Sequence, residues 1–256
     1  MKIVVCAKFV PDATADRRFR SEDNTVDRAG VDGLLSELDE YAVETALTVK
    51  EAGDAEVTVL TVGPEQAADA VKKGLQMGAD AGVHVLDDAI HGSDAVATSL
   101  ILSKALAKLE ADLVVFGMGS TDGGMGVVPA MVSERLGLPA VTLGSEVTVD
   151  GQTVRIRRDG DTASETIEGT LPLVLSVSDQ ANEPRYPSFK GIMAAKKKPV
   201  QTLSLAELGL SADEVSATSA VLEFTKRRER SGGTKVTDEG DGGSQLVAYL
   251  ATEKFV

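Results

Sequence analysis

The sequence predicts an α/β fold with a doubly wound, mostly parallel sheet, an antiparallel excursion and a C-terminal arm. Three observations predict the sheet. Short β-branched runs alternate with amphipathic stretches over the first two thirds of the chain, which is typical of parallel strands connected by helices. The runs are almost continuously apolar, as in strands buried on both faces. A glycine-rich stretch also follows one of these runs, and ligands bind at the carboxyl ends of parallel strands.

The buried strands are recognised by runs of Val, Leu, Ile and Thr, which favour extended backbone. We expect four of them at residues 2–7, Glu56–Val62, 82–85 and 112–117. A fifth, at residues 171–177, follows later in the chain. These strands would form the buried sheet.

Capping residues and apolar periodicity predict four helices between these strands. The first covers residues 39–51, where apolar side chains recur on one face. Pro64 begins the second helix, and Ser93 is expected to cap the third. The fourth has Pro129 in its first turn, where a missing backbone N–H costs nothing. The helices therefore alternate with the strands, as a doubly wound sheet requires.

From residue 143 the apolar pattern changes to a period of two, which indicates half-buried strands. Three such runs at 145–149, 153–157 and 163–167 are separated by Asp-Gly pairs. Asp-Gly is a strong signal for a tight hairpin turn. We therefore expect an antiparallel excursion.

The last part of the chain loses this regularity. An irregular segment is expected at 179–191, and residues 211–243 are rich in Ser, Thr, Glu and Gly, with one last short helix at 245–254. A segment of this composition has too few apolar residues to bury a core of its own. We therefore interpret it as an arm that lies on a partner subunit.

Composition and charge exclude several classes of function. The 256 residues include 26 Lys and Arg against 40 Asp and Glu, a formal net charge of −14, whereas nucleic-acid binding over the whole surface needs a basic footprint. One cysteine excludes an internal disulfide framework, and two histidines make a metal site improbable. No apolar run approaches the ~18 residues of a membrane span. We expect a cytoplasmic protein without membrane insertion, a metal site or a catalytic residue.

The most informative stretch is GMGSTDGGMGVVP at residues 117–129. Glycines between a strand and a helix let backbone N–H groups approach an anion, and the helix dipole adds to the attraction. The stretch lacks the Lys-Ser/Thr of the Walker pattern, and it does not follow the first strand as the dinucleotide pattern does. Nucleotide or phosphate binding is the functional interpretation, and a tight turn is the structural alternative.

A second stretch, NEPRYPSFKGIMAAKKK at residues 182–198, combines two prolines, large apolar side chains and a basic run. Large apolar side chains on a stiff loop act as anchors in protein interfaces. The alternatives are that these side chains fold back into the core and that the lysines form a solvated helix end.

Both stretches, together with DEYAVETAL, LTVGPEQAADAVKKGLQMGAD and the opening VCAKFVPD, resemble the beta subunits of electron transfer flavoproteins. The resemblance covers essentially the whole chain. It implies a Rossmann-like fold of the adenine-nucleotide-binding type, with a nucleotide-binding domain at residues 1–200 and an arm at 201–256 that packs on the partner. It also implies an electron carrier rather than an enzyme: a heterodimer whose alpha subunit holds FAD, while the beta subunit binds AMP.

The resemblance implies an AMP pocket built from the end of the first strand, the start of the first helix, the end of the second strand and the glycine-rich loop. Its residues would be Cys6, Ala7, Lys8, Ser36, Leu38, Asp39, Val62, Gly63, Gly117, Ser120, Thr121, Asp122, Gly123, Gly124, Met125, Gly126, Val127 and Val128.

The resemblance also assigns residues 182–198 to a recognition loop that docks acyl-CoA and other flavin dehydrogenases. The docking residues would be Glu183, Pro184, Arg185, Tyr186, Phe189, Ile192, Met193, Lys196, Lys197 and Lys198. Phe189 occupies the position of the family's leucine anchor and keeps an apolar side chain there. Electrons would pass to a membrane quinone oxidoreductase, in the service of fatty acid oxidation.

The chain departs from the family pattern at two places. Ser36-Glu37-Leu38 replaces the Asn-Pro-Phe of many members, and Val127 and Val128 replace polar residues of the loop. Three alternatives stay open at this point: an electron-bifurcating subunit with a second FAD and NADH, a regulatory nucleotide-binding protein of the universal-stress type, and a nucleotide-dependent enzyme such as an ATP pyrophosphatase.

The remaining chemically active residues have simpler interpretations. We expect Cys6 to be a packed thiol, because no thiolate-stabilising partner is evident. His84 and His91 are expected on the surface or in loops. The basic run 226–230 would pair with an acidic partner surface or be solvated.

Overall fold

The computed structural model describes residues 1–225, 232–233 and 235–256, so the basic run 226–230 lies outside the described residues. These residues divide into two compact units, 1–222 and 223–256.

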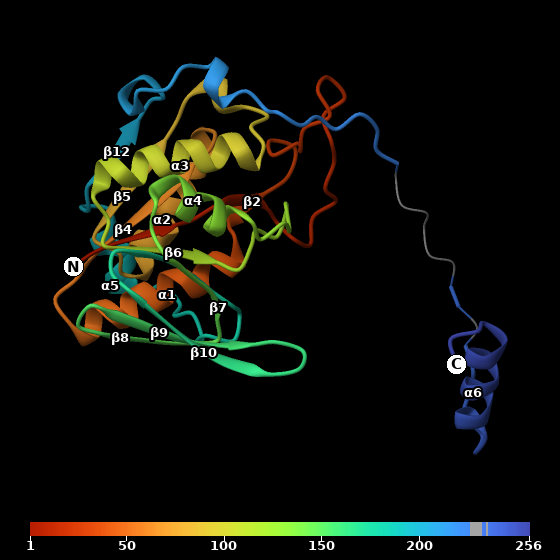
Figure 1. Cartoon of the computed structure of the whole chain (residues 1–256). Coiled ribbons are helices and arrows are strands. Elements are labelled where there is room, and N and C mark those ends of the chain that lie inside the picture. Colours follow the sequence, from red (N-terminus) through yellow and green to blue (C-terminus); the bar gives the residue numbers. More distant parts are fainter. Residues whose placement is uncertain (226–231, 234) are drawn as a thin grey trace. The chain divides into compact units, whose positions relative to one another are not determined.

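The first unit is built on a sheet of seven described strands (Figure 1). They are β1 (Lys2–Cys6), β4 (Glu56–Val62), β5 (Ala81–Val85), β6 (Leu113–Gly117), β7 (Ala140–Gly144), β11 (Leu173–Val177) and β12 (Val200–Leu203). Their order is β12-β5-β4-β1-β6-β11-β7, and neighbouring strands run parallel. After β1 the chain adds β4 and β5 on one side and then crosses to place β6 on the other. The fold class is confirmed, and the order reverses direction between β1 and β6.

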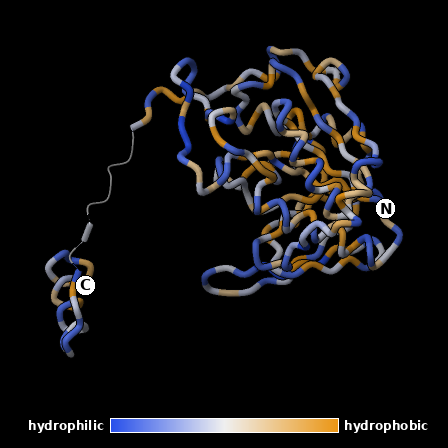
Figure 2. The backbone as a smooth tube through the Cα atoms, turned by 180° about the vertical axis from the view of Figure 1, so that it is seen from behind, coloured by the Kyte–Doolittle hydropathy of each residue, from blue (hydrophilic) through white to orange (hydrophobic). Residues whose placement is uncertain are grey.

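Helices cover both faces of this sheet because successive strand residues point to opposite faces. Helices α1 (Glu37–Ala52) and α2 (Ala68–Met77) pack on one face, where Ile3 and Val5 are buried. Helices α3 (Ala95–Leu109) and α4 (Val128–Leu136) pack on the other, where Val4 and Cys6 are buried. In Figure 2 the hydrophobic segments accordingly concentrate inside this unit.

The antiparallel excursion is confirmed as a separate sheet. Its strands are β8 (Glu146–Asp150), β9 (Thr153–Asp159) and β10 (Ser164–Thr170), in the order β10-β9-β8. Val154 and Ile156 on β9 are buried and belong to the hydrophobic core on the α1 and α2 face of the main sheet. Arg155 on the outer face pairs with Glu168 on β10 at 2.6 Å between Nε and Oε1. The period-two pattern therefore predicted the antiparallel strands correctly.

Some elements differ from the sequence-based expectation. A hairpin of β2 (Phe9–Pro11) and β3 (Gly33–Leu35) flanks an excursion of the chain, residues 12–32. Helix α5 (Phe189–Ala195) occupies the end of the segment expected to be irregular. These elements are short, and their identity depends on tertiary contacts more than on local pattern.

Two side-chain assignments were wrong. Asp94, not Ser93, caps α3: Asp94 Oδ1 accepts the N–H of Ala97 at 3.0 Å, while the Ser93 hydroxyl donates to Val215 O at 3.1 Å. His84 lies on β5 and is buried, with Nε2 3.0 Å from the carbonyl oxygen of Gly63. Aspartate and serine cap equally well, so tertiary contacts decided between them.

Residues 201–222 pack on their own domain, although they belong to the predicted arm. Strand β12 pairs with β5, and the short 3₁₀ turns at Ala206–Leu208 and Asp213–Val215 place Leu208 and Val215 in the core beside α3. Asp94 Oδ2 accepts the backbone N–H of Thr218 at 2.8 Å. The second unit therefore begins only at residue 223, well inside the predicted arm.

The second unit contains helix α6 (Gly242–Thr252), whose described residues are all at least partly exposed. Leu246, Val247 and Tyr249 expose more than half of their surface. Among the helices of the described residues, none has the length and apolar character that crossing a membrane requires.

Candidate functional site

The candidate site lies where the strand order changes direction. The carboxyl ends of β1 and β6 are adjacent at this point, because Ile3, Val4 and Val5 pair with Leu113, Val114 and Val115. Lys8 follows β1, and the glycine loop, residues 117–127, follows β6. Open parallel sheets bind ligands in the crevice that forms at such a switch point.

The start of α1 packs directly against the first residue of the glycine loop. A Cβ added to Gly117 would lie 2.4 Å from the carbonyl oxygen of Leu38 and 2.7 Å from Asp39 Oδ1. Asp39 Oδ2 accepts the backbone N–H of Lys8 at 2.8 Å, which connects the head of α1 to the end of β1. The structure therefore brings together three of the four predicted pocket segments: the end of β1, the head of α1 and the glycine loop.

The fourth segment, Val62–Gly63, ends the neighbouring strand β4. Its position at the carboxyl end of β4 follows from the parallel pairing of β1 with β4. The N–H of Gly63 donates to Val85 O at 3.2 Å, which ties this turn to β5. The segment thus lies on the same edge of the sheet as the glycine loop, one strand further along.

The backbone of the glycine loop is shaped for close approach. Gly124 and Gly126 have φ values of +65° and +64°, which disfavour residues with a side chain. The N-cap of α4 is Val127, whose apolar side chain cannot accept a hydrogen bond. The first-turn N–H groups of a helix attract anions unless a cap satisfies them. The loop and the start of α4 therefore have the chemistry of a phosphate site.

Basic side chains surround one buried carboxylate in the loop. Asp122, whose side chain is 3% exposed, pairs with Lys8 Nζ at 2.9 Å and with Arg28 Nη2 at 2.7 Å. Arg17 Nη1 donates to the carbonyl oxygen of Thr121 at 2.7 Å. Burial by itself raises the pKa of Asp122, but the charges of Lys8 and Arg28 outweigh burial and hold that pKa well below its usual range. Three cations thus surround the loop, and Asp122 stays ionised.

Arg17 and Arg28 are absent from the predicted pocket. Both belong to the excursion 12–32, and Arg28 is 94 positions away from Asp122 in the sequence. The only signal in the sequence was an unassigned arginine-rich stretch ahead of the first helix. No local spacing rule relates it to the glycine loop.

The head of α1 also contains a buried hydroxyl. Ser36, which is fully buried, has no hydrogen-bond partner for its Oγ among the described residues. A buried hydroxyl without a partner is costly. Ser36 therefore has spare hydrogen-bonding capacity at the position where the sequence predicted a nucleotide contact.

The buried groups near this site have strongly altered acidities. Asp39 is 6% exposed, and burial raises its pKa to about 7, although the N–H donors Lys8 and Gly117 and the charge of Lys8 act in the opposite direction. Burial also raises the pKa of the Cys6 thiol, and the carboxyl group of Asp39 adds to this effect. Cys6 is therefore a packed thiol, as expected.

Replacing Asp39 by asparagine is expected to flatten the dependence of stability on pH. The unfolded chain loses the Asp39 proton near pH ~4, whereas the folded chain keeps it to about pH 7. Between these values the folded state binds more protons, so the free energy of unfolding falls as the pH rises. One proton corresponds to a slope of at most about 1.4 kcal/mol per pH unit. Urea unfolding across this pH window measures the slope, and equal slopes in both proteins contradict the assignment.

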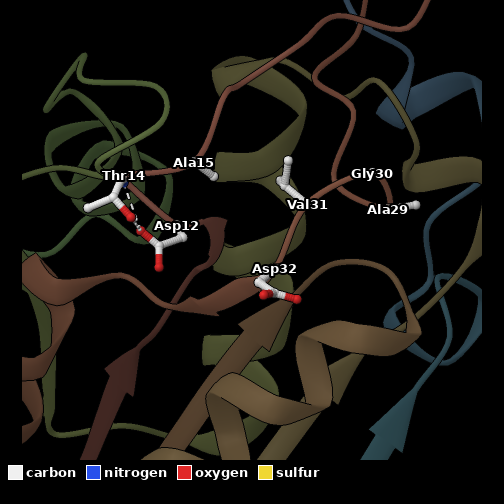
Figure 3. A pocket seen from close by; sticks show the side chains of 7 residues that line it. All are labelled: Asp12, Thr14, Ala15, Ala29, Gly30, Val31 and Asp32. Carbon is white, nitrogen blue, oxygen red and sulfur yellow. Dashed lines mark hydrogen bonds between the residues drawn. The ribbon is translucent and has the colours of Figure 1, made fainter.

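A separate hollow lies within the excursion 12–32 (Figure 3). It is lined by Asp12, Thr14, Ala15, Ala29, Gly30, Val31 and Asp32. Asp12 Oδ1 accepts both the N–H and the hydroxyl of Thr14 at 2.7 Å, and these bonds lower the pKa of Asp12. The carboxylates of Asp12 and Asp32 line this hollow, and their negative charge disfavours binding of a phosphate there. Nowhere in the described part of the chain do three or more His, Cys, Asp or Glu residues gather closely enough to hold a metal ion.

The predicted docking segment, residues 182–198, is held against α1 by a clamp of charges. Arg185 Nε and Nη2 each lie 2.8 Å from a carboxylate oxygen of Glu44, and Arg185 also pairs with Glu51. The Asn182 side-chain amide donates to Tyr41 O at 3.0 Å. The carboxylates of Glu44 and Glu51 raise the pKa of Arg185 further above its usual value, the hydrogen bond to Glu44 most strongly. Arg185 therefore fixes the segment on its own domain.

A second group of contacts fixes α5 on α2. A Cβ at Gly191 would lie 2.5 Å from the carbonyl oxygen of Gln76, so only glycine allows this approach. The Ser188 hydroxyl accepts the N–H of Gly191 at 3.0 Å, and Lys198 Nζ donates to Leu75 O at 2.9 Å. Lys198 therefore braces the segment and remains partly exposed.

The remaining side chains of the segment point away from the core. Tyr186 is 91% exposed and Phe189 is 81% exposed, with Ile192 and Met193 partly exposed beside them. Lys196 and Lys197 are also exposed. The alternative in which these apolar side chains fold into the core is wrong. The result is an apolar surface on a rigid support, with two lysines next to it.

Comparison with known proteins shows what the chain is similar to. The family described as electron transfer flavoprotein domain matches residues 23–208. A protein of Mycobacterium tuberculosis (strain ATCC 25618 / H37Rv) named electron transfer flavoprotein subunit beta is 48% identical over 263 residues, covering 99% of each chain. A protein of the same name from Megasphaera elsdenii is 32% identical over 267 residues, covering 100% of this chain and 98% of the relative.

Proposed function

Because this chain belongs to the electron transfer flavoprotein family, as a beta subunit, we propose that it is half of a heterodimeric electron carrier and that its own ligand is AMP. A beta subunit is an electron transfer protein rather than an enzyme. In this proposal the alpha subunit holds FAD, and the chain described here binds AMP at the switch point of its sheet.

The observation that carries the AMP proposal is the convergence at the ends of β1 and β6. The glycine loop, the start of α4 and the cation Lys8 fit a phosphate group. The buried hydroxyl of Ser36 is available for a further polar contact. Val127 and Val128 provide no polar side chains, so backbone N–H groups would carry most of the phosphate binding.

The exposed side chains of residues 182–198 support a docking role. A rigid apolar anchor such as Phe189 loses little conformational entropy on binding, and the clamp between Arg185 and Glu44 keeps its support in place. Acyl-CoA and other flavin dehydrogenases are the proposed donors, and a membrane quinone oxidoreductase is the proposed acceptor. Bound FAD would supply the redox chemistry, while this chain positions the donor and shields the flavin from water. Fatty acid oxidation in the cytoplasm is the proposed setting.

The second unit is proposed to pack on the alpha subunit. Helix α6 presents Leu246, Val247 and Tyr249 without burying them in its own unit. Burial of apolar area of this kind is the main favourable contribution to subunit association.

Purification of the tagged chain from its native host tests the proposal. We expect an alpha-type flavoprotein to co-purify, with one FAD and one AMP released per heterodimer on denaturation. Two FAD and no AMP would replace the proposal by an electron-bifurcating complex that uses NADH. A colourless homodimer that releases ATP or AMP would instead favour a nucleotide-binding regulatory protein and contradict the carrier function.

A further inference from the structure

We propose that Arg28 is a positioning residue of the nucleotide site, and that through it the excursion 12–32 holds the glycine loop in its binding conformation. The inference rests on the AMP site proposed above. It assigns a role to a residue outside the predicted pocket and to the segment that connects β2 with β3.

The contact that carries the inference is the pairing of both carboxylate oxygens of Asp122. Oδ1 lies 2.9 Å from Lys8 Nζ, and Oδ2 lies 2.7 Å from Arg28 Nη2. The Asp122 side chain is almost completely buried, and that of Arg28 is mostly buried. Arg28 Nη1 also donates to the carbonyl oxygen of Phe9 at 3.3 Å, so its guanidinium joins β2 to the loop.

Asp122 in turn determines the conformation of the loop backbone. Its Oδ1 accepts the N–H of Gly123 at 2.7 Å, and the hydroxyl of Ser120 accepts the same N–H at 3.2 Å. The next turn is closed by the N–H of Gly124, which donates to Ser120 O at 2.9 Å. The orientation of the Asp122 carboxylate therefore sets the turn from which the loop continues to α4.

Removal of Arg28 would leave one oxygen of a buried, ionised carboxylate without its cation. Such a group must regain solvent or be neutralised, because a buried charge without a partner is costly. Either change alters the turn at Gly123. The loop would then have to be ordered when the nucleotide binds, and this ordering reduces the affinity.

Other arginines of the excursion make weaker or unrelated contacts. Arg17 is exposed and bonds only to a neutral carbonyl oxygen of the loop, that of Thr121, among the contacts described. Arg18 pairs with Asp16 at 3.0 Å, and both side chains are largely exposed. Arg18 is therefore a matched control, since the same substitution in the same excursion should leave the loop unaffected.

The test measures AMP binding to the nucleotide-free heterodimer by calorimetry, at a temperature well below the melting temperature of each variant. We expect Arg28→Met to raise the Kd for AMP about tenfold or more and Arg28→Lys to raise it about threefold, because lysine keeps the charge but not the planar fork. Arg18→Met should stay within about twofold. Hydrogen exchange of residues 117–127 should be faster in Arg28→Met before AMP is added.

An unchanged Kd and unchanged loop exchange in Arg28→Met would overturn the inference, even if the melting temperature falls, because Arg28 would then only stabilise the fold. If Arg28→Met does not yield a folded heterodimer, the Kd for AMP of Arg28→Lys is used instead. A Kd equal to that of the unsubstituted heterodimer would then overturn the inference. AMP binding to the unsubstituted heterodimer tests the proposed AMP site separately from the role of Arg28. If this heterodimer binds no AMP, the proposed function is wrong and the inference is overturned with it.

Discussion

Gly117→Ala is expected to destabilise the chain by about 3 kcal/mol and to abolish tight AMP binding. The added Cβ would lie 2.4 Å from Leu38 O, 2.7 Å from Asp39 Oδ1 and 2.8 Å from the carbonyl carbon of Leu38. Two of these neighbours are backbone atoms, so the end of β6 and the start of α1 must move apart. This movement separates two of the segments that form the site.

Thermal unfolding measures the loss of stability, and for a chain of this size ~3 kcal/mol corresponds to a fall of roughly 6–12 °C in melting temperature. Gly119→Ala is the matched control, because a Cβ there meets its nearest neighbour, in Gly126, at 3.7 Å. It should change the melting temperature by less than ~2 °C. Equal effects of the two substitutions would show that the contact between β6 and α1 does not constrain the site.

Phe189→Ala is expected to lower kcat/KM for reduction by a dehydrogenase roughly 30-fold, with the flavin content unchanged. A central aromatic anchor contributes about 2 kcal/mol or more to a protein interface, and ~1.4 kcal/mol is a factor of ten. Phe189 is 81% exposed on a support fixed by Arg185 and Gly191. Truncation should therefore remove the contact without disturbing the fold, and the melting temperature should stay constant.

Two variants control this experiment. Phe189→Leu keeps an apolar side chain at the position and should retain activity within about threefold. Val96→Ala truncates another exposed apolar side chain, on α3, and should have no effect. Undiminished electron acceptance from every dehydrogenase tested would contradict the docking role of Phe189.

Helix α5, at the end of the proposed docking segment, and the glycine loop lie at opposite edges of the sheet. Gly191 on α5 and Lys198 after it pack against the last turn of α2, which leads into the amino end of β5. The glycine loop follows the carboxyl end of β6. In Figure 1, α5 accordingly lies near the N-terminus of the chain, at the amino edge. The exposed side chains of α5 and the glycine loop therefore lie at different edges of the sheet.

The sequence by itself determined five of the seven described parallel strands, the antiparallel excursion and the glycine loop, but neither β7 nor β12 was predicted. In each case the determining signal is local. Residues such as 113–117 are apolar throughout because both faces of β6 are buried, and residues 153–159 alternate because one face of β9 is exposed. The motifs at 117–129 and 182–198 also placed the chain in its family, because they are contiguous in the sequence.

Only the tertiary structure decided which side chains meet across long sequence separations. Arg28 reaches Asp122 over 94 positions, and Arg185 reaches Glu44 over 141. Lys198 Nζ donates to Leu75 O over 123 positions, and β12 joins the sheet from a segment without a clear strand pattern. The physical reason is that periodicity reports the environment of a residue, whereas an ion pair depends on two backbones that the whole fold brings together.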